Sequence, residues 1–456
     1  MLITHENLAK SESFKMADVE GSMPVLAVTA AVGAFVLLFV LLCGIGRRQN
    51  DKSENDDKGE DKKQAKKLQK QTTKKEKKPL GHRKDAKVVF NHPWLAGSLK
   101  SHSGPVLGLD FSPNGKYLAS CSEDRSVLIW HVKDFAKKEH KSIRSNIELD
   151  HATRVRFSPD SKAFMVSLFN ENAIRVIKIG RKDDGSIGNF QTALDFPKGH
   201  DADLINTGIS SNGKFIMTCS KDTTIKLWDL KGELLSTIDT HQMNNSHGAV
   251  SPCGRFVGSS GFTPDVKVWE VIFDRSGQFK EVIRAFELKG HSAGVYSFAF
   301  SGNSDRMATV SKDGTWKLWD INVEYRKQQD PRLLKTGRCV HSGTSVIALS
   351  PDGVTIAIAC NHDISVYNTV NTECEQIIEE AHILPICCLE FDTMGHYLVS
   401  AGDKNINVFH NIVGFRAHIA ELEEKKRSAV GQTHRQRIQQ QIQEACTKLK
   451  QLGASP

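Results

Sequence analysis

The chain has 456 residues, with 39% hydrophobic and 25% charged residues, which is the composition of an ordinary globular protein. Ten cysteines in this length exclude a small disulfide scaffold. The net charge of +8 is concentrated in residues 47–84, which carry fifteen Lys/Arg and seven Asp/Glu. Because residues 1–23 net −2, the remainder nets +2, which argues against a globular nucleic-acid domain with a dominant basic face.

A membrane segment is predicted near the N-terminus. The run Val25–Ile45 contains no charged residue, and as a helix it would span about 32 Å, close to the roughly 30 Å hydrocarbon core of a bilayer. We therefore expect a short extension over residues 1–23 and a transmembrane helix over residues 24–46. Arg47 and Arg48 follow the run, so the positive-inside rule predicts a luminal N-terminus and a cytosolic remainder.

Two alternatives to this single-pass anchor remain, a buried soluble helix and a cleaved signal peptide. The flank that precedes the apolar run is acidic, whereas a signal peptide favours a positive flank. Met1, Met16 and Met23 are all candidate start residues.

A Lys-rich linker is expected over residues 47–92, because its low apolar content cannot support a core. It is either a solvated tether or a contact for anionic phosphate groups of lipid or RNA. Without interleaved aromatic residues, RNA binding here would be independent of base sequence and sensitive to salt. The candidate phosphate or RNA contacts are Lys62, Lys63, Lys66, Lys67, Lys70, Lys74, Lys75, Lys77 and Lys78.

The rest of the chain is periodic, which indicates a repeat architecture. Four histidines are each followed 28 residues later by a tryptophan: His102 and Trp130, His200 and Trp228, His241 and Trp269, His291 and Trp319. Three weaker units pair His151 with Lys178, His341 with Tyr367, and His382 with Phe409. Ser-Pro-x-Gly turns at 112–115, 251–254 and 350–353 each precede a short run that reads as a strand.

Residues 93–411 resemble the WD40 repeat. The signature is Gly-His at 199–200 and 290–291, with Trp-Asp at 228–229 and 319–320. The resemblance implies an all-β fold, a seven-bladed β-propeller of four-stranded antiparallel blades. Residues around Trp94–Leu99 are expected to close the ring as the outer strand of the last blade.

The same resemblance implies structural tetrads, in which Trp, Ser/Thr, His and Asp form a buried hydrogen-bond chain rather than a catalytic triad. The tetrads are His102, Ser120, Asp124, Trp130; His200, Thr218, Asp222, Trp228; and His291, Thr309, Asp313, Trp319. Other units depart from this pattern, with Asn172 and Lys178 in unit two, Thr263 in unit four, Asn361 and Tyr367 in unit six, and Phe409 beside a retained Asp403 in unit seven. The register of units four and six is therefore open.

Four basic residues adjoin the structural aspartates or their equivalents, at Arg125, Lys221, Lys312 and Lys404. We expect them at one rim of the propeller. They are candidates for binding an acidic peptide or a phosphate group, and ordinary surface charge is the alternative.

A helical tail is expected over residues 412–456. Ile438, Ile442, Ala445, Leu449 and Leu452 form an apolar stripe at helical spacing. Ile419 and Leu422 belong to an earlier turn or to a second helix. The stripe packs on itself or on the propeller, or it serves a partner helix.

No catalytic or nucleotide-binding motif is present in the sequence, so we expect no enzyme activity, catalytic residue, metal, cofactor or small-molecule substrate. The cysteines form no Cys-x-x-Cys pair and read as reduced, structural thiols of a cytosolic domain. The adjacent Cys387 and Cys388 are expected to point to opposite faces of a strand.

Several longer runs resemble a WD-repeat protein of the endoplasmic reticulum membrane, at 148–152, 242–245, 261–270, 284–293, 310–320 and 435–441. This likeness implies a single-pass, cytosol-facing scaffold for protein–protein interactions in stress signalling and translational control. Its expected partners are an endoplasmic-reticulum stress-sensing kinase and translation factors. The alternative is an RNA-associating adaptor that uses the Lys-rich linker and the basic rim.

Overall fold

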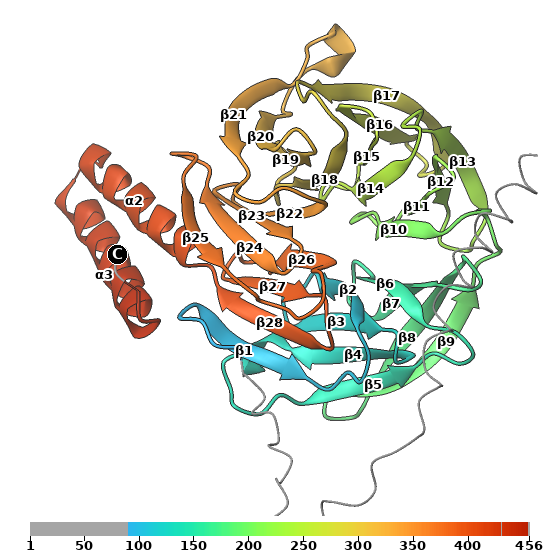
Figure 1. Ribbon diagram of the computed structural model, residues 1–456, viewed down its shortest axis with the longest axis horizontal. Coiled ribbons are helices and arrows are strands. Elements are labelled where there is room, and N and C mark those ends of the chain that lie inside the picture. The colour runs from blue at the N-terminus through green and yellow to red at the C-terminus, as the bar shows by residue number, and fades with distance from the viewer. Residues whose placement is uncertain (1–89, 430, 455–456) are drawn as a thin grey trace, which may run out of the picture. The chain divides into compact units, whose positions relative to one another are not determined.

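The computed structural model describes residues 90–429 and 431–454. Seven four-stranded antiparallel sheets stand side by side in a ring (Figure 1), which confirms the predicted seven-bladed propeller. The N-terminal extension, the predicted transmembrane helix and the nine linker lysines lie outside the described residues. Within the part that is described, no helix is long and apolar enough to cross a membrane.

Each blade is numbered by the order of its first strand along the chain. Blade 1 contains β2 (Val106–Phe111), β3 (Tyr117–Ser122), β4 (Ser126–His131) and β5 (Ser142–Asn146). Blade 2 contains β6 (Ala152–Phe157), β7 (Ala163–Leu168), β8 (Ile174–Arg181) and β9 (Ile187–Asp195). Blade 3 contains β10 (Leu204–Ile209), β11 (Ile216–Ser220), β12 (Thr224–Trp228) and β13 (Leu234–Asp239).

The remaining blades follow the same order. Blade 4 contains β14 (Asn245–Val250), β15 (Phe256–Gly261), β16 (Asp265–Phe273) and β17 (Phe279–Lys289). Blade 5 contains β18 (Val295–Phe300), β19 (Arg306–Ser311), β20 (Thr315–Asp320) and β21 (Arg332–Arg338). Blade 6 contains β22 (Ser345–Leu349), β23 (Thr355–Cys360), β24 (Asp363–Asn368) and β25 (Cys374–Ile378). Blade 7 contains β26 (Cys388–Phe391), β27 (Tyr397–Ala401), β28 (Asn405–His410) and β1 (Leu95–Lys100).

The Ser-Pro-x-Gly turns connect the first and second strands of their blades. In blade 1 the Ser112 hydroxyl accepts a hydrogen bond from the backbone N–H of Tyr117 at 2.9 Å. Gly115 has φ +68°, a conformation that glycine adopts without the steric cost that a Cβ brings. The next strand, β3, is buried at every position because neighbouring blades cover both of its faces.

Strand β1 closes the ring, as predicted, by pairing antiparallel with β28 at the edge of blade 7. Leu99 lies opposite Ile406 and is only 1% exposed. The chain comes so close to Phe135 at Gly97 that an added Cβ would lie 2.4 Å from the Phe135 carbonyl oxygen. The last blade is thus built from strands at the two ends of the repeat region.

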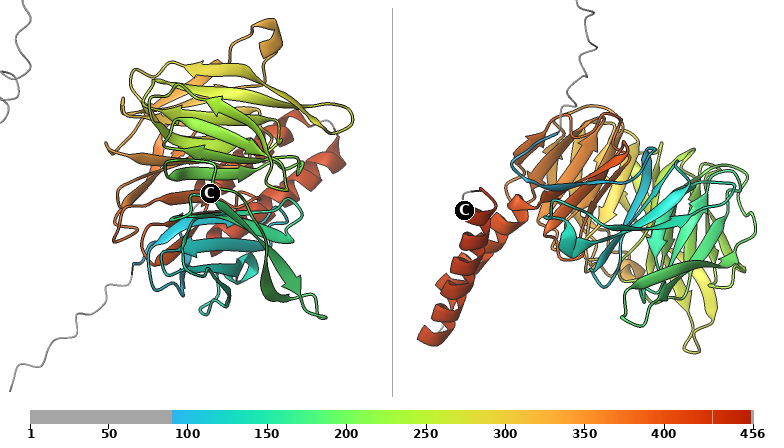
Figure 2. Two further views of the ribbon diagram at one scale, coloured as in Figure 1. Left: turned by 90° about the vertical axis from the view of Figure 1, so that its right-hand side faces the viewer. Right: turned by 90° about the horizontal axis from the view of Figure 1, so that it is seen from below.

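Two helices follow the propeller, α2 (Ile412–Ser428) and α3 (Gln432–Gln451), and they pack against each other as a hairpin beside the ring (Figures 1 and 2). The Asn411 side chain begins α2 by accepting a hydrogen bond from Gly414 N–H at 3.0 Å. Ile438, Ile442 and Leu449 of the predicted stripe join one apolar cluster with Ile419 and Leu422 of α2. Phe415 stacks on His396 of blade 7 at 5.6 Å.

Candidate interaction face and central channel

The antiparallel order of each blade places two sets of loops at the same end of the ring. The loop that enters each first strand and the turn between each second and third strand meet there, because the first and third strands begin at that end. The tetrad histidines occupy the entering loops and the tetrad aspartates occupy the turns. We call this end of the propeller the tetrad face.

Hydrogen bonds join all four side chains of the tetrads in blades 1, 3 and 5. In blade 5, Trp319 Nε1 donates to Thr309 Oγ1 at 3.0 Å, and His291 Nε2 lies 2.8 Å from the same oxygen. His291 Nδ1 lies 2.9 Å from Asp313 Oδ2. The corresponding three distances are 2.9, 2.8 and 3.0 Å in blade 1 and 2.9, 2.7 and 2.8 Å in blade 3.

The surroundings of the tetrads keep the histidines neutral and the aspartates charged. Desolvation by burial lowers the pKa of His291, against the opposing effect of Asp313. Burial alone would raise the pKa of Asp313, but hydrogen bonds from Thr315, Ser292 N–H and His291 outweigh it and lower the pKa to about 2. The donors therefore hold the aspartate in its charged form, and the Thr309 hydroxyl of the same tetrad is buried and bonded to His291 and Trp319.

Blade 2 has no tetrad, and the residue equivalent to tryptophan differs from the one that the sequence suggested. Lys178 is exposed, whereas Ile177 is 3% exposed and pairs with Phe164 as Trp130 pairs with Leu118 in blade 1. Asn172 lies in the turn between β7 and β8 with φ +49°. The prediction for Lys178 was wrong by one residue, because neighbouring residues of a strand point to opposite sides and the residue paired with Phe164 is Ile177.

Blade 4 corrects a second sequence assignment. The ring of His241 is 75% exposed and pairs with Asp239, so this histidine does not enter the blade. Gln242 takes the buried position, and its Nε2 donates to the carbonyls of Ser259 at 3.2 Å and Asp265 at 3.3 Å. Thr263, expected at the aspartate position, donates to the Gln242 amide oxygen instead. A neutral amide and hydroxyl replace the His–Asp pair.

Blades 6 and 7 retain fragments of the tetrad. In blade 7, His382 Nε2 lies 2.8 Å from Ser400 Oγ, Asp403 lies 3.3 Å from the same ring, and the buried Phe409 provides no N–H. In blade 6, the Tyr367 hydroxyl accepts from Val340 N–H at 3.0 Å. Asn361 occupies the turn after β23 with φ +53°.

All four candidate rim residues are exposed on the tetrad face, each in the turn between the second and third strands of its blade: Arg125 in blade 1, Lys221 in blade 3, Lys312 in blade 5 and Lys404 in blade 7. They therefore surround the ring rather than forming one cluster. Lys221 is already engaged by Asp203 at 2.9 Å.

Sequence reasoning missed a set of apolar side chains at the same end of the ring. The entering loops and turns of blades 2, 4, 6 and 7 expose Leu149, Phe169, Met243, Phe262, Val340, Ile383 and Leu384. Leu149 is 90% exposed, Ile383 82% and Met243 75%, although burying such side chains is favourable. The sequence does contain a feature that indicates these exposed residues, which is a large apolar residue inside a polar loop. Leu149 between Glu148 and Asp150 is an example.

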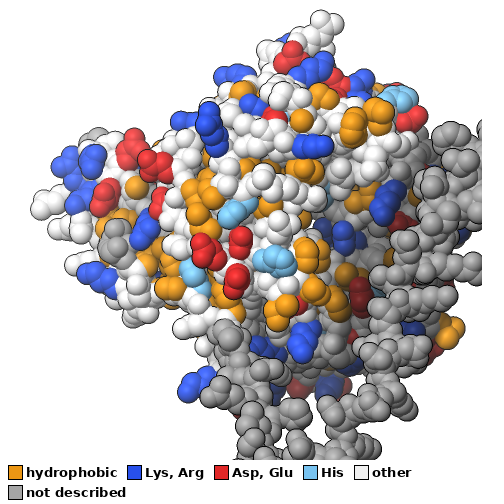
Figure 3. All heavy atoms as spheres, viewed as in Figure 1, with side chains coloured by type: hydrophobic (Ala, Val, Ile, Leu, Met, Phe, Trp, Pro, Cys, Tyr) orange, Lys and Arg blue, Asp and Glu red, His pale blue; other side chains and the backbone are white. Residues whose placement is uncertain are grey.

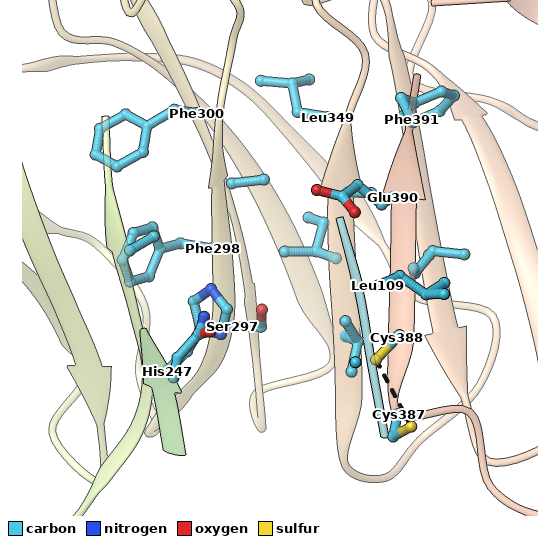
Figure 4. Close-up of a pocket in the computed structure, with 18 of the residues that line it drawn as sticks. Leu109, His247, Ser297, Phe298, Phe300, Leu349, Cys387, Cys388, Glu390 and Phe391 are labelled. Carbon is cyan, nitrogen blue, oxygen red and sulfur yellow. Dashed lines mark hydrogen bonds between the residues drawn. The ribbon is translucent and has the colours of Figure 1, made fainter. Parts of the chain in front are cut away.

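A channel of about 470 Å³ runs through the centre of the ring, where Figure 3 shows the surface hollowed and bordered by apolar side chains. First strands of several blades line it, and Figure 4 shows His247 and Phe298 facing Cys388 and Glu390 across the space. The wall therefore combines apolar, acidic and thiol groups.

Arg154, Arg156, Glu390 and Asp392 are the charged residues that line this channel, and Asp110 pairs with Arg156 beside it. Arg156 Nη1 lies 3.1 Å from Asp110 Oδ1 and 3.9 Å from Glu390 Oε1. Arg154 Nη1 donates to the Leu107 and Thr153 carbonyls at 2.7 and 2.8 Å. Desolvation raises the pKa of Asp110 and that of Glu390, and the negative charge of Asp110 raises the latter further. Arg156 therefore pairs with two carboxyl groups, those of Asp110 and Glu390, and burial favours the protonated form of both.

Comparison with known proteins agrees with this architecture. The WD40 pattern, described as "WD domain, G-beta repeat", matches residues 94–131, 191–229, 283–320 and 373–410. Mouse transducin beta-like protein 2 is 56% identical over 80% of this chain and 83% of its own length, and the human protein is 55% identical over 80% and 82%. Telomerase protein component 1 of rat is 27% identical over 57% of this chain, which covers 9% of that protein.

WD40 propellers are scaffolds for protein–protein interactions, and the tetrads, the ring closure and the repeat matches all carry this signature. The close likeness to two curated proteins extends over four-fifths of the sequence. The chain therefore belongs to the WD40-repeat family and is similar to transducin beta-like protein 2.

Proposed function

We propose that this protein is a membrane-anchored, cytosol-facing WD40 scaffold at the endoplasmic reticulum that binds protein partners on its tetrad face. The observation that carries the binding surface is the set of exposed apolar side chains in the entering loops and turns, interspersed with Arg125, Lys312 and Lys404. An apolar surface with basic neighbours suits a partner segment that has large apolar side chains and acidic flanks.

Matched charge insertions at the two ends of the ring test this surface. Met243→Asp and Ile383→Asp place a carboxylate on the tetrad face, whereas Met394→Asp does so at the opposite end, where Met394 is 70% exposed. Proximity labelling and affinity capture with the full chain should lose the same partners in the first two variants and retain them in the third. Equal loss in all three, or no loss, would refute the tetrad face as the binding surface.

The location rests on the apolar run Val25–Ile45 and the two arginines that follow it, together with the likeness to an endoplasmic-reticulum protein. Protease protection of sealed microsomes, with a tag at the C-terminus, tests the orientation. We expect digestion of the tag without detergent and no glycan on Asn244, an exposed acceptor in the sequence Asn-Asn-Ser. A protected tag with a glycosylated Asn244 would place the propeller in the lumen.

The proposed role is in stress signalling and translational control, with a stress-sensing kinase of the endoplasmic reticulum and translation factors as partners. This role is inferred only from the likeness to transducin beta-like protein 2, so identification of the bound partners tests it. Partners captured by the unaltered chain and lost from Ile383→Asp should include such a kinase or translation factors. Capture of neither class would remove this role and leave the scaffold assignment intact.

A second candidate function is association with RNA, favoured by the net charge of +10 in residues 62–84. Crosslinking of RNA to the full chain and to a chain lacking residues 62–84 distinguishes its possible sites. Loss of crosslinking on deletion would assign it to Lys62–Lys84, and persistence would move it to the basic residues of the propeller. Absence in both chains would exclude this function.

A further inference from the structure

Two adjacent thiols lie side by side in the wall of the central channel. Cys387 and Cys388 have their sulfur atoms 3.7 Å apart (Figure 4), although successive residues of a strand point to opposite faces. The expectation of opposite orientation was wrong because β26 begins only at Cys388, so Cys387 still belongs to the preceding loop. Both residues are partly exposed and line the channel.

Contacts with blade 1 position each sulfur. The Cys387 thiol lies 3.1 Å from the carbonyl oxygen of Val106, and the Cys388 thiol lies 3.2 Å from that of Leu107. These carbonyls belong to successive residues of β2, so the neighbouring blade presents two acceptors in the same order as the two thiols. The pair is therefore a preorganised part of the boundary between blades 7 and 1.

The sulfur separation fits one bridging atom better than a direct bond. A disulfide requires sulfur atoms about 2.0 Å apart, much closer than the 3.7 Å observed. Two bonds of about 2.3 Å, as in metal thiolates, place the sulfurs about 3.8 Å apart at a tetrahedral angle and about 4.6 Å apart in a line. The observed distance matches the bent arrangement.

The channel also favours a reactive thiolate at one of the two positions. Besides the Val106 carbonyl, the single Cys387 proton has a second acceptor in the Cys388 sulfur. Donation to that sulfur lowers the pKa of Cys388 against the opposing effect of burial, and the nearby charges of Arg154 and Arg156 act in the same direction. The thiolate is the form of cysteine that attacks electrophiles and binds soft metals. Cys121 has no exposed surface, and burial raises its pKa.

A third ligand is missing for a tetrahedral metal ion. Among residues 90–429 and 431–454, no group of three or more His, Cys, Asp or Glu side chains is arranged to hold one. The ligand that fits must therefore form two bonds to sulfur at a bent angle and complete its valence with a group of its own.

We propose that Cys387 and Cys388 form a dithiol site that binds a trivalent organoarsenical, with arsenic bridging the two sulfur atoms. In this step the arsenic–oxygen bond of an organoarsenic oxide breaks and two arsenic–sulfur bonds form. The two thiol protons leave with the oxide oxygen as one molecule of water. Arsenic stays trivalent and both sulfurs remain thiolates, so no oxidant or reductant is needed.

Phenylarsine oxide added to the full chain tests the proposal. Intact-mass analysis should show a phenylarsenic group that replaces two thiol protons and maps to the peptide with Cys387 and Cys388. Both residues should become protected from iodoacetamide, and a small dithiol should reverse the protection whereas a monothiol in equal amount should not. A bidentate adduct is expected to exceed monothiol adducts in affinity by at least tenfold.

Serine variants separate the site from other thiols. Cys387→Ser and Cys388→Ser should each abolish the monothiol-resistant adduct, since a hydroxyl can still donate to the Val106 or Leu107 carbonyl and preserve the fold. The control is Cys253→Ser, because Cys253 is an exposed thiol outside the channel. Thermal unfolding identifies any variant that fails to fold, and Cys387→Ala then replaces it. Retention of the adduct in folded variants at both positions would overturn the proposal.

Discussion

In each complete tetrad, three hydrogen bonds connect four side chains from four segments of one blade. The oxygen of Thr309 is shared between Trp319 and His291, so its hydroxyl is the central member of the chain in blade 5. Because Thr309 and Trp319 have no more than 2% exposure, water has little access to replace a lost bond.

Replacing Thr309 by valine keeps the shape of the side chain and removes this shared oxygen. We expect the free energy of unfolding to fall by about 1–3 kcal/mol, because Trp319 and His291 each lose a buried partner. Urea unfolding monitored by tryptophan fluorescence measures the change. Thr192→Val, on the exposed outer strand β9, is the matched control and should change stability by less than about 0.5 kcal/mol. Equal values for the two variants would contradict the structural role of the tetrad.

The tetrad aspartates predict a specific dependence of stability on pH. The pKa of Asp313 is about 2 in the folded chain, below its ordinary value of 3.8, so the ionised form stabilises the fold above about pH 4. This contribution is lost as the pH falls from 4 toward 2. The lowered pKa corresponds to about 2 kcal/mol of stability.

Asp313→Asn should therefore destabilise the protein by about 2 kcal/mol at pH 7, and the difference from the unaltered chain should shrink between pH 4 and pH 2. Urea unfolding across this range measures both quantities. Asp183→Asn, in an exposed turn, is the control and should show no such pH-dependent difference. A constant difference down to pH 2 would show that the charge of Asp313 does not stabilise the fold.

At the scale of single residues, the sequence predicted the tetrads because their spacing is regular, and it failed where the spacing changed. Ile177 replaces Lys178 and Gln242 replaces His241 at inward positions, each displaced by one residue. In β8 a displacement of one residue reverses the side of the strand, and the pairing of Ile177 with Phe164 determines it. Gln242 lies in the loop that enters blade 4, where spacing does not determine which side chain turns inward. The thiol pair at Cys387 was missed for the same reason, since the start of β26 decides its orientation.

At the scale of elements, the helical hairpin extends the apolar core of blades 6 and 7. Its two helices share one apolar cluster with residues of blades 6 and 7, among them Ile378 and Phe409. Arg416 of α2 also reaches Glu375 of β25 at 3.3 Å. The apolar stripe that the sequence revealed is thus covered by the chain itself, and its spacing alone did not specify which surface would cover it.

Leu449→Ala should loosen this hairpin while leaving the propeller folded. Leu449 has no exposed surface, so its truncation should cost about 2–5 kcal/mol of local stability. Hydrogen exchange should accelerate in residues 412–451 and stay unchanged in the blades. Lys450→Ala, at an exposed position one residue later, is the control. Faster exchange throughout the ring would show that the hairpin and the propeller unfold as one unit.

At the scale of the whole molecule, the ring depends on a single strand from the N-terminal side of the repeats. Strand β1 completes blade 7 and places Leu99 in the apolar cluster that blades 1 and 7 share. The sequence predicted this closure together with the WD40 resemblance, which assigned residues around Trp94–Leu99 to the outer strand of the last blade. It did not predict the exposed apolar side chains of the tetrad face, since exposure depends on how all the loops assemble.

Leu99→Ala should weaken the closure of the ring, since it leaves a cavity between two blades. The expected loss is about 2–5 kcal/mol, with hydrogen exchange accelerating first in β1 and β28. Leu234→Ala is the matched control, because Leu234 also lies on an outer strand and is 50% exposed. Uniform acceleration across the seven blades would mean that closure does not limit the opening of the ring.

The meeting of the first and last strands of the propeller, β1 and β28, on blade 7 has a mechanical consequence. Strand β1 brings the chain in from Trp94, and α2 begins two residues after β28 ends. A pulling force applied between residue 90 and α3 would act on the β1–β28 pairing and on the contacts of the helical hairpin with blades 6 and 7. Under tension β1 would separate from β28 first, and the other sheets would keep their shape until that pairing had broken.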